Sequence, residues 1–183
     1  MGEERNVCFK IDSVQAFIDK VLVPDHSEFM NDSANIRLAF HDAIDLFHLV
    51  DWVFHSNKTI GSLNFIGPFG SEKKAKDEKE FANILESEDS SFGIIRGVAN
   101  SLKHLELRAV PKTLGAPTHA ANTFVSGTGY GMGRFGEGPF GGTETVKIQG
   151  PDGDDRPYSV FSTSVLDMWR DLFAKNGWGE IPQ

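Results

Sequence analysis

Residues 33–56 read SANIRLAFHDAIDLFHLVDWVFHS, the longest stretch of helical periodicity in the chain. Apolar side chains recur there at the spacing of one face of an α-helix. Asp32 or Ser33 is suited to cap its beginning, because a short polar side chain accepts hydrogen bonds from the first free N–H groups of a helix. The segment therefore predicts a long helix and, with it, a mainly α-helical fold.

Four further segments carry helical periodicity and predict the rest of a helical bundle. They lie at 13–21, 71–85, 91–107 and 163–176. Pro24 and Pro111 follow two of them, and Gly177 follows the last in a position that favours a left-handed residue after a helix. We expect about five helices in all, packed around a core that contains Phe47, Phe54, Ile95, Leu102 and Trp169.

The sequence changes in character beyond the fourth of these segments. Residues 126–142 are rich in glycine, but no helix follows them whose N-terminus would hold a phosphate, so we expect an irregular loop. Residues 143–149 and 158–160 alternate around a turn at 151–153, which predicts a β-hairpin. We expect a single domain over 1–183, with its helical core at about 13–107 plus 163–176 and the loop and hairpin at about 113–161.

Composition excludes several classes of protein. The chain has 18 Lys and Arg against 26 Asp and Glu, a formal charge of −8 that opposes non-specific binding to DNA. Its one cysteine, Cys8, cannot form an intramolecular disulfide. No apolar run is long enough to span a membrane, and the charged N-terminus does not resemble a signal peptide. We expect a cytoplasmic protein that does not bind membranes.

A polar stripe follows one side of the long helix. It consists of Arg37, His41, Asp45, His48 and His55. His41, Asp45 and His48 share a face at a spacing that would present three ligands to a divalent metal, so a metal-binding helical protein is one alternative. The other is a solvated or hydrogen-bonded helical face that holds no metal.

A second polar stripe lies on the helix at 91–107 and consists of Arg96, Asn100, Lys103 and His104. Its cations are suited to bind a phosphate while His104 transfers a proton, the combination that metal-free RNA cleavage requires. In the structural interpretation, these side chains instead fix the register of the helix through hydrogen bonds to the first stripe, that of Asp45 and the histidines.

A helical bundle with an Arg…Asn…His helix resembles the HEPN superfamily over roughly residues 13–107. Seven residues separate Arg96 from His104 here and Gly97 follows the arginine, whereas the family pattern has a shorter spacing and often a polar residue in that place. The resemblance implies a small, often dimeric protein of RNA processing or cellular defence, in which Arg96 holds a phosphate, Asn100 and Lys103 stabilise charge and His104 is the acid or base. Residues 99–106 also resemble segments of uncharacterised bacterial and phage proteins, from which no function transfers.

Three functions therefore stay open at the level of sequence. If the chain is an enzyme, we expect a metal-independent ribonuclease without a cofactor, with RNA and a second copy of the chain as its partners. The second is not an enzyme but a non-catalytic interaction or structural module, in which both stripes serve to pack helices. The third is the metal-binding protein built on His41, Asp45 and His48.

Overall fold

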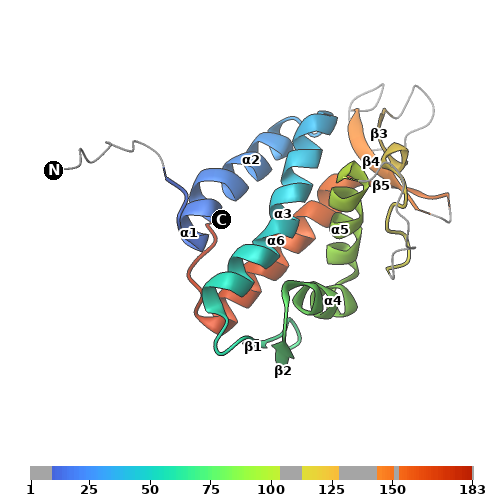
Figure 1. Cartoon of the computed structure of the whole chain (residues 1–183). Helices are drawn as coiled ribbons and strands as arrows, with labels where there is room; N and C mark the ends of the chain where they lie inside the picture. Colours follow the sequence, from blue (N-terminus) through green and yellow to red (C-terminus); the bar gives the residue numbers. More distant parts are fainter. Residues whose placement is uncertain (1–9, 104–112, 128–143, 151–152, 183) are drawn as a thin grey trace.

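The structure is a computed structural model that describes residues 10–103, 113–127, 144–150 and 153–182, and these residues are mostly helical (Figure 1). The helical elements are α1 (Val14–Phe17), the π-helical turn η1 (Ile18–Leu22), α2 (Val23–Asn31), α3 (Ile36–Asn57), α4 (Glu78–Glu88), α5 (Ser90–Lys103), the 3-10 turn η2 (Ala120–Asn122) and α6 (Tyr158–Asn176). The strands are β1 (Leu63–Ile66), β2 (Glu72–Ala75), β3 (Thr123–Ser126), β4 (Thr145–Gln149) and β5 (Asp155–Pro157). The strands form two small antiparallel sheets, β1-β2 and β3-β4-β5.

The core lies between α3, α5 and α6, which contact one another, while α2 runs along the other side of α3 (Figure 1). Trp169 of α6 is wholly buried, and its indole N–H donates to the Leu46 carbonyl of α3 at 3.1 Å. Three aromatic rings meet its ring edge to face, at centroid distances of 6.1, 6.3 and 6.4 Å: Phe81, Phe92 and Phe173. This packing confirms that the long predicted helix joins the helix of Arg96 and the final helix in one core.

The predicted core residues are mostly confirmed. Phe54, Ile95 and Trp169 are buried, and Phe47 is half-buried against the core. The prediction is wrong for Leu102, which is 38% exposed near the end of α5. Helical spacing locates the apolar face, but it does not tell how far a neighbouring element covers that face.

The sequence predicts that the first helix ends before Pro24, and this prediction is wrong. The helical segment continues past the proline. Ser13 caps it, with its hydroxyl oxygen accepting a hydrogen bond from the Ala16 N–H at 3.1 Å. Pro24 has no N–H, and in a regular α-helix its ring would collide with the carbonyl four residues earlier. The wider turn η1 accommodates it: there the Val23 N–H donates to the Ile18 carbonyl. The chain therefore continues through the proline as α2.

The predicted helix over 71–85 is wrong in its first part. Residues 72–75 instead form β2, which pairs with β1. Ala75 is buried opposite Leu63. The helix α4 starts only after Asp77, whose Oδ1 accepts a hydrogen bond from the Glu80 N–H at 2.7 Å. The lysine-rich stretch has a helical pattern of charges, but pairing with a strand that the sequence analysis missed decides its conformation.

A two-residue turn leads from α3 into β1. Thr59 and Ser62 exchange backbone hydrogen bonds of 2.8 and 3.1 Å around Ile60 and Gly61. Both central residues have positive φ, 47° at Ile60 and 75° at Gly61, which is the pattern of turns that favour Asn-Gly. Ile60 is fully exposed, so no packing compensates the strain of a β-branched residue in this region.

We expect Ile60→Asn to stabilise the chain by about 1 kcal/mol, because asparagine tolerates positive φ and no buried surface is lost. Urea unfolding followed by circular dichroism measures this gain. Gly61→Ala is the matched control and should lower stability, although nothing lies within 4 Å of the added methyl group. A destabilising Ile60→Asn would show that the isoleucine makes a contact that outweighs its strain.

The C-terminal part contains the predicted hairpin with shifted boundaries. β4 lies in the first predicted strand, but the second strand is β5, and residues 158–160 already belong to α6 rather than to a strand. β3 adds a third strand that the sequence analysis missed. Gly177 ends α6 with φ +65°, as predicted. Most of the glycine-rich segment, at 128–143, lies outside the described residues.

α5 begins one residue earlier than predicted, because Oδ1 of Asp89 accepts hydrogen bonds from the N–H groups of Ser91 and Phe92 at 2.7 and 3.3 Å. The last part of the predicted helix, residues 104–107, lies outside the described residues. Within the part of the chain that the structure describes, no helix combines the length and the apolar character needed to cross a membrane.

Candidate functional site: a buried polar junction of three helices

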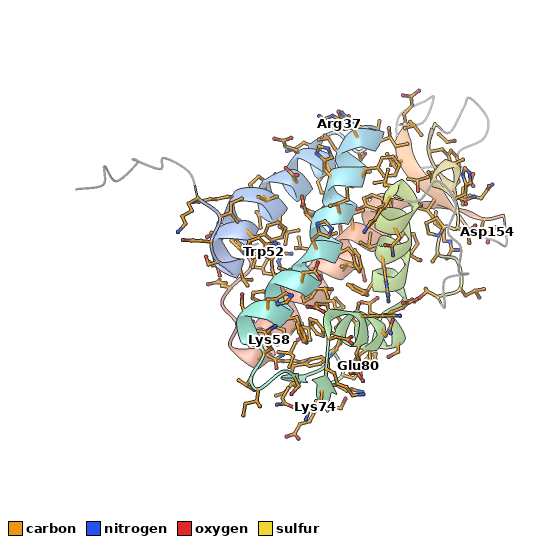
Figure 2. All side chains as sticks on the ribbon, viewed as in Figure 1. Arg37, Trp52, Lys58, Lys74, Glu80 and Asp154 are labelled. Carbon is orange, nitrogen blue, oxygen red and sulfur yellow. The ribbon has the colours of Figure 1, made fainter. Side chains whose placement is uncertain are left out.

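The polar stripe of α3 does not form one site. Arg37, His41, His48 and His55 are exposed, and Figure 2 shows Arg37 near the start of the helix. Asp45 is only 8% exposed and interacts with the neighbouring helix α2. The stripe therefore divides into a part that faces solvent and one buried carboxyl group.

This division bears on the alternative metal site. His41 and His48 are exposed while Asp45 is buried, and the described ranges contain no group of three or more His, Cys, Asp or Glu side chains placed to hold a metal ion. Metal ligands must converge on one point at bonding distance. The structure therefore does not bring His41, Asp45 and His48 together as a ligand set, and their role as metal ligands stays a prediction.

The predicted catalytic residues of α5 are described in part. Arg96 and Asn100 are half-buried and Lys103 is exposed, whereas His104 lies outside the described residues. The distance between the predicted phosphate-binding arginine and the predicted acid or base is therefore not defined. Their assignment as a catalytic set stays a prediction.

Arg96 has partners on the neighbouring helix α4. Its Nη1 donates to Asn83 Oδ1 and to Glu86 Oε2, both at 2.8 Å, and its guanidinium group lies 5.9 Å from the centre of the Phe47 ring. The other oxygen of Glu86 accepts hydrogen bonds from Thr113, 3.1 Å from the backbone N–H and 2.7 Å from the hydroxyl. One carboxylate thus links α4, α5 and the residues beyond α5.

A second group of polar side chains lies deeper, where α2, α3 and α6 meet. Asp42 of α3 is wholly buried. Its Oδ1 lies 2.9 Å from Nδ1 of His26, and its Oδ2 accepts hydrogen bonds from the Tyr158 and Ser162 hydroxyls at 2.7 and 2.5 Å. Burial and the charge of Asp42 raise the pKa of Tyr158 well above its usual value, which keeps the phenol a donor. These partners offset the large cost of burying a carboxylate.

Beside Asp42, the carboxyl group of Asp45 is buried near two other carboxyl groups, those of Asp25 and Asp42. Burial raises the pKa of Asp45 to about 8, and a hydrogen bond with Asp25 and the charges of Asp25 and Asp42 contribute to the shift. Oδ2 of Asp45 is buried and has no hydrogen-bond partner among the described residues. The raised pKa favours the protonated form of Asp45 near neutral pH.

Serine, histidine and aspartate meet in this junction without forming a hydrolytic triad. In a triad, the two ring nitrogens of histidine serve aspartate and serine separately. Here Ser162 Oγ and Asp42 both face the same atom, Nδ1 of His26, and the wholly buried Ser162 donates its proton to Asp42. The arrangement instead joins α2, α3 and α6 through hydrogen bonds to one buried carboxylate.

The sequence contained a signal for part of this junction. Asp42 lies on the apolar side of α3 among Ala39, Ala43 and Leu46, and an aspartate in that place requires buried donors. Its partners His26, Tyr158 and Ser162 could not be found in this way, because no local spacing connects them with α3. Our sequence analysis assigned no role to Asp42.

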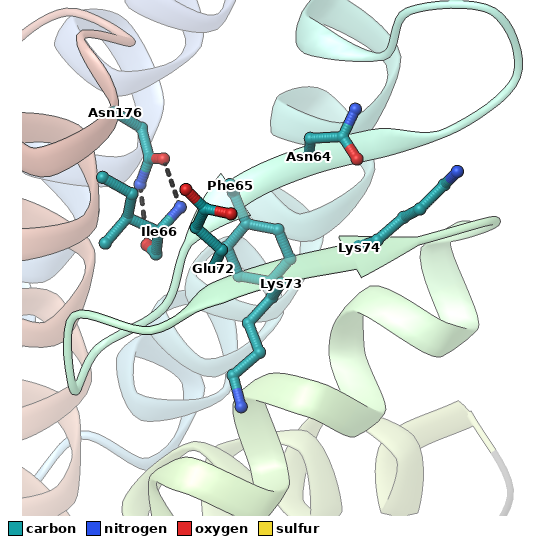
Figure 3. A pocket seen from close by; sticks show the side chains of 7 residues that line it. All are labelled: Asn64, Phe65, Ile66, Glu72, Lys73, Lys74 and Asn176. Carbon is teal, nitrogen blue, oxygen red and sulfur yellow. Dashed lines mark hydrogen bonds between the residues drawn. The ribbon is translucent and has the colours of Figure 1, made fainter.

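A shallow hollow of about 560 Å³ lies on the β1-β2 hairpin (Figure 3). It is lined by Asn64, Phe65, Ile66, Glu72, Lys73, Lys74 and Asn176. The Asn176 amide from the end of α6 accepts from the Ile66 N–H at 2.6 Å and donates to the Ile66 carbonyl at 2.9 Å, while Lys73 pairs with Glu88 at 2.5 Å. Part of its polar lining is thus engaged in holding the hairpin against α6 and α4.

Comparison with known proteins adds no family to these observations. No protein-family model, no curated protein and no solved structure matches this chain significantly.

Proposed function

We propose that this chain is a non-catalytic helical module, a helical bundle whose interior polar residues hold its helices in register. The pairing of Arg96 carries this proposal. Its guanidinium group binds Glu86 and Asn83 of α4, with 19% of the Arg96 side chain and 9% of the Glu86 side chain exposed. The structural interpretation of the second polar stripe expects such a link between helices, although it expected the first stripe as the partner and Arg96 pairs with α4 instead.

The same pairing opposes a role in substrate binding. An arginine that grips a phosphate needs N–H donors aimed at the place where the substrate lies. Turning Arg96 toward a phosphate would leave the buried Glu86 carboxylate without its cation, and an unpaired buried charge is costly. The Thr113 hydrogen bonds add to this constraint, because they hold the other oxygen of Glu86 in place.

A double-mutant cycle tests the proposal. We expect Glu86→Gln and Arg96→Met each to cost about 1–3 kcal/mol in urea unfolding, and the double variant to cost about 1–2 kcal/mol less than the sum. Lys103→Met is the matched control, because this exposed cation on the same helix should change stability by less than about 0.5 kcal/mol. Additive effects of the two single changes would contradict a structural pair.

The ribonuclease prediction expects a loss of activity, which measurements on Arg96→Met and on a further variant, His104→Ala, can test. If Arg96, Asn100, Lys103 and His104 act on RNA, the purified chain cleaves RNA in the presence of a chelator. Arg96→Met and His104→Ala would each abolish that cleavage, and His104→Ala would leave the melting temperature unchanged. This outcome would overturn the proposed function. Native mass spectrometry of the same preparation tests the two predicted partners, a second copy of the chain and RNA.

A further inference from the structure

The hairpin of β1 and β2 has one face that is open to solvent. The side chains on this face are exposed: Asn64, Ile66, Glu72 and Lys74. Their neighbours along the strands point the other way, as Lys73 does in Figure 3, where it pairs with Glu88 of α4. The four exposed side chains line the hollow of Figure 3, so this hollow is an open sheet face, which we call the hairpin face.

Two opposite charges lie side by side on the hairpin face. Glu72 and Lys74 are two residues apart on β2, so their side chains leave the same side of the strand about 7 Å apart. Within the described ranges, neither side chain has a hydrogen-bond or ion-pair partner. A two-fold axis that lies in the face and crosses β2 at Lys73 places Glu72 of each copy opposite Lys74 of the other. The charges of the face are therefore complementary to a second copy of the same face.

The turns at the two ends of the hairpin face each carry an exposed apolar side chain. Ile60, in the turn before β1, is fully exposed, and Phe69, in the turn between the strands, is 78% exposed. They lie five residues before and four residues after Phe65, which pairs with Lys73 at the same axis. The rotation that matches the charges therefore also brings Ile60 of each copy toward Phe69 of the other.

The hairpin face is held in place by side chains of α6. Asn176 binds both backbone groups of Ile66, and Lys175 Nζ donates to the Pro68 carbonyl at 2.5 Å. These bonds fix the end of β1 and the turn that carries Phe69. A surface that is already ordered loses little conformational freedom on binding, so its association with a partner is less costly.

We propose that the hairpin face is the contact surface of a symmetric dimer of this chain. Glu72 of each copy pairs with Lys74 of the other, and Ile60 of each copy packs on Phe69 of the other. The face of one short hairpin is smaller than the interface of a stable complex, so the dimer is weak and forms at high concentration. This inference does not rest on the proposed function, because the pairing of Arg96 takes no part in it.

Charge reversal tests the dimer, with sedimentation equilibrium of the full chain from about 10 µM to about 1 mM, the range of weak complexes. Glu72→Lys and Lys74→Glu each bring like charges together twice, so we expect each to weaken self-association at least about tenfold. An equimolar mixture of the two variants restores opposite charges and should associate again. Arg37→Glu is the matched control, because it changes the net charge as Lys74→Glu does but lies at the opposite end of the molecule (Figure 2).

Two uncharged variants test the apolar part of the contact. We expect Ile60→Asn and Phe69→Ser each to weaken the dimer at least about fivefold, because each removes apolar surface from both ends of the contact. Ile60→Asn keeps the fold or stabilises it, so its effect on association is not a folding defect. Val160→Ser, a change of an exposed residue on α6, is the control and should associate as the unchanged chain does.

Several results would overturn the dimer. A chain that stays monomeric up to the highest concentration has no such contact. A mixture of Glu72→Lys and Lys74→Glu that fails to associate, or an equal loss in Arg37→Glu, would show that net charge and not this pairing governs association. Binding of the monomer to vesicles of phosphatidylcholine and phosphatidylserine, lost in Phe69→Ser and without self-association, would assign the face to a membrane instead.

Discussion

Trp169→Ala is expected to lower the free energy of unfolding by about 4 kcal/mol, among the largest losses of any single substitution in this chain. Trp169 is wholly buried where α3, α4, α5 and α6 meet. Its removal leaves a cavity among Phe81, Phe92 and Phe173, and the Leu46 carbonyl loses its donor. Both effects lower the free energy of unfolding.

Urea unfolding of Trp169→Ala and Trp169→Phe separates the two contributions. Phenylalanine keeps most of the packing but has no N–H, so we expect a loss of about 1–2 kcal/mol. Val160→Ala on the same helix is the matched control and should cost less than about 0.5 kcal/mol, because Val160 is 61% exposed. A loss below about 1 kcal/mol for Trp169→Ala would show that the core closes around the missing ring.

Asp42→Ala is expected to cost about 3–5 kcal/mol, although it removes a charge from the interior. The cost arises because the hydrogen-bond partners of Asp42 stay in place without it. His26, Tyr158 and Ser162 would lose a shared acceptor, and the two hydroxyls are wholly buried, where no water replaces it.

Thermal and urea unfolding of Asp42→Ala and Asp42→Asn measure this cost. Asparagine still accepts hydrogen bonds through its carbonyl but brings an amide that must find acceptors, so we expect a smaller loss of about 1–3 kcal/mol. Asp51→Ala is the control, because Asp51 is exposed on the same helix. Equal stability of Asp42→Ala and Asp51→Ala would contradict the junction as a structural link.

The parts of the fold that sequence predicted well depend on local chemistry. The long helix α3 follows from its apolar spacing, and the end of α6 follows from Gly177, which has the left-handed conformation that glycine favours. The hairpin of β1 and β2 escaped prediction because its strands are short and its second strand has four charged or small residues, EKKA. Its pairing partner, and not its own pattern, determines that conformation.

The candidate site could likewise be predicted from sequence only where local spacing determines it. Spacing places Arg96 and Asn100 on one side of α5, but it does not reveal that Glu86 of another helix neutralises the arginine. Asp42 could have been singled out as a charged residue on an apolar face. The raised pKa of Asp45 could not, because it arises only when packing buries this carboxyl group near Asp25 and Asp42.

Asn176 gives the exposed hairpin a further property. A strand at the edge of a sheet offers free N–H and C=O groups to which another chain can add. The amide of Asn176 occupies both of these groups at Ile66, as a residue of a third strand would. Directly after the other strand, the N–H of Lys76 donates to the Glu80 carboxylate at 2.8 Å. Side chains of two different helices thus occupy backbone groups at Ile66 and at Lys76. A strand of another molecule cannot pair with the hairpin through these groups.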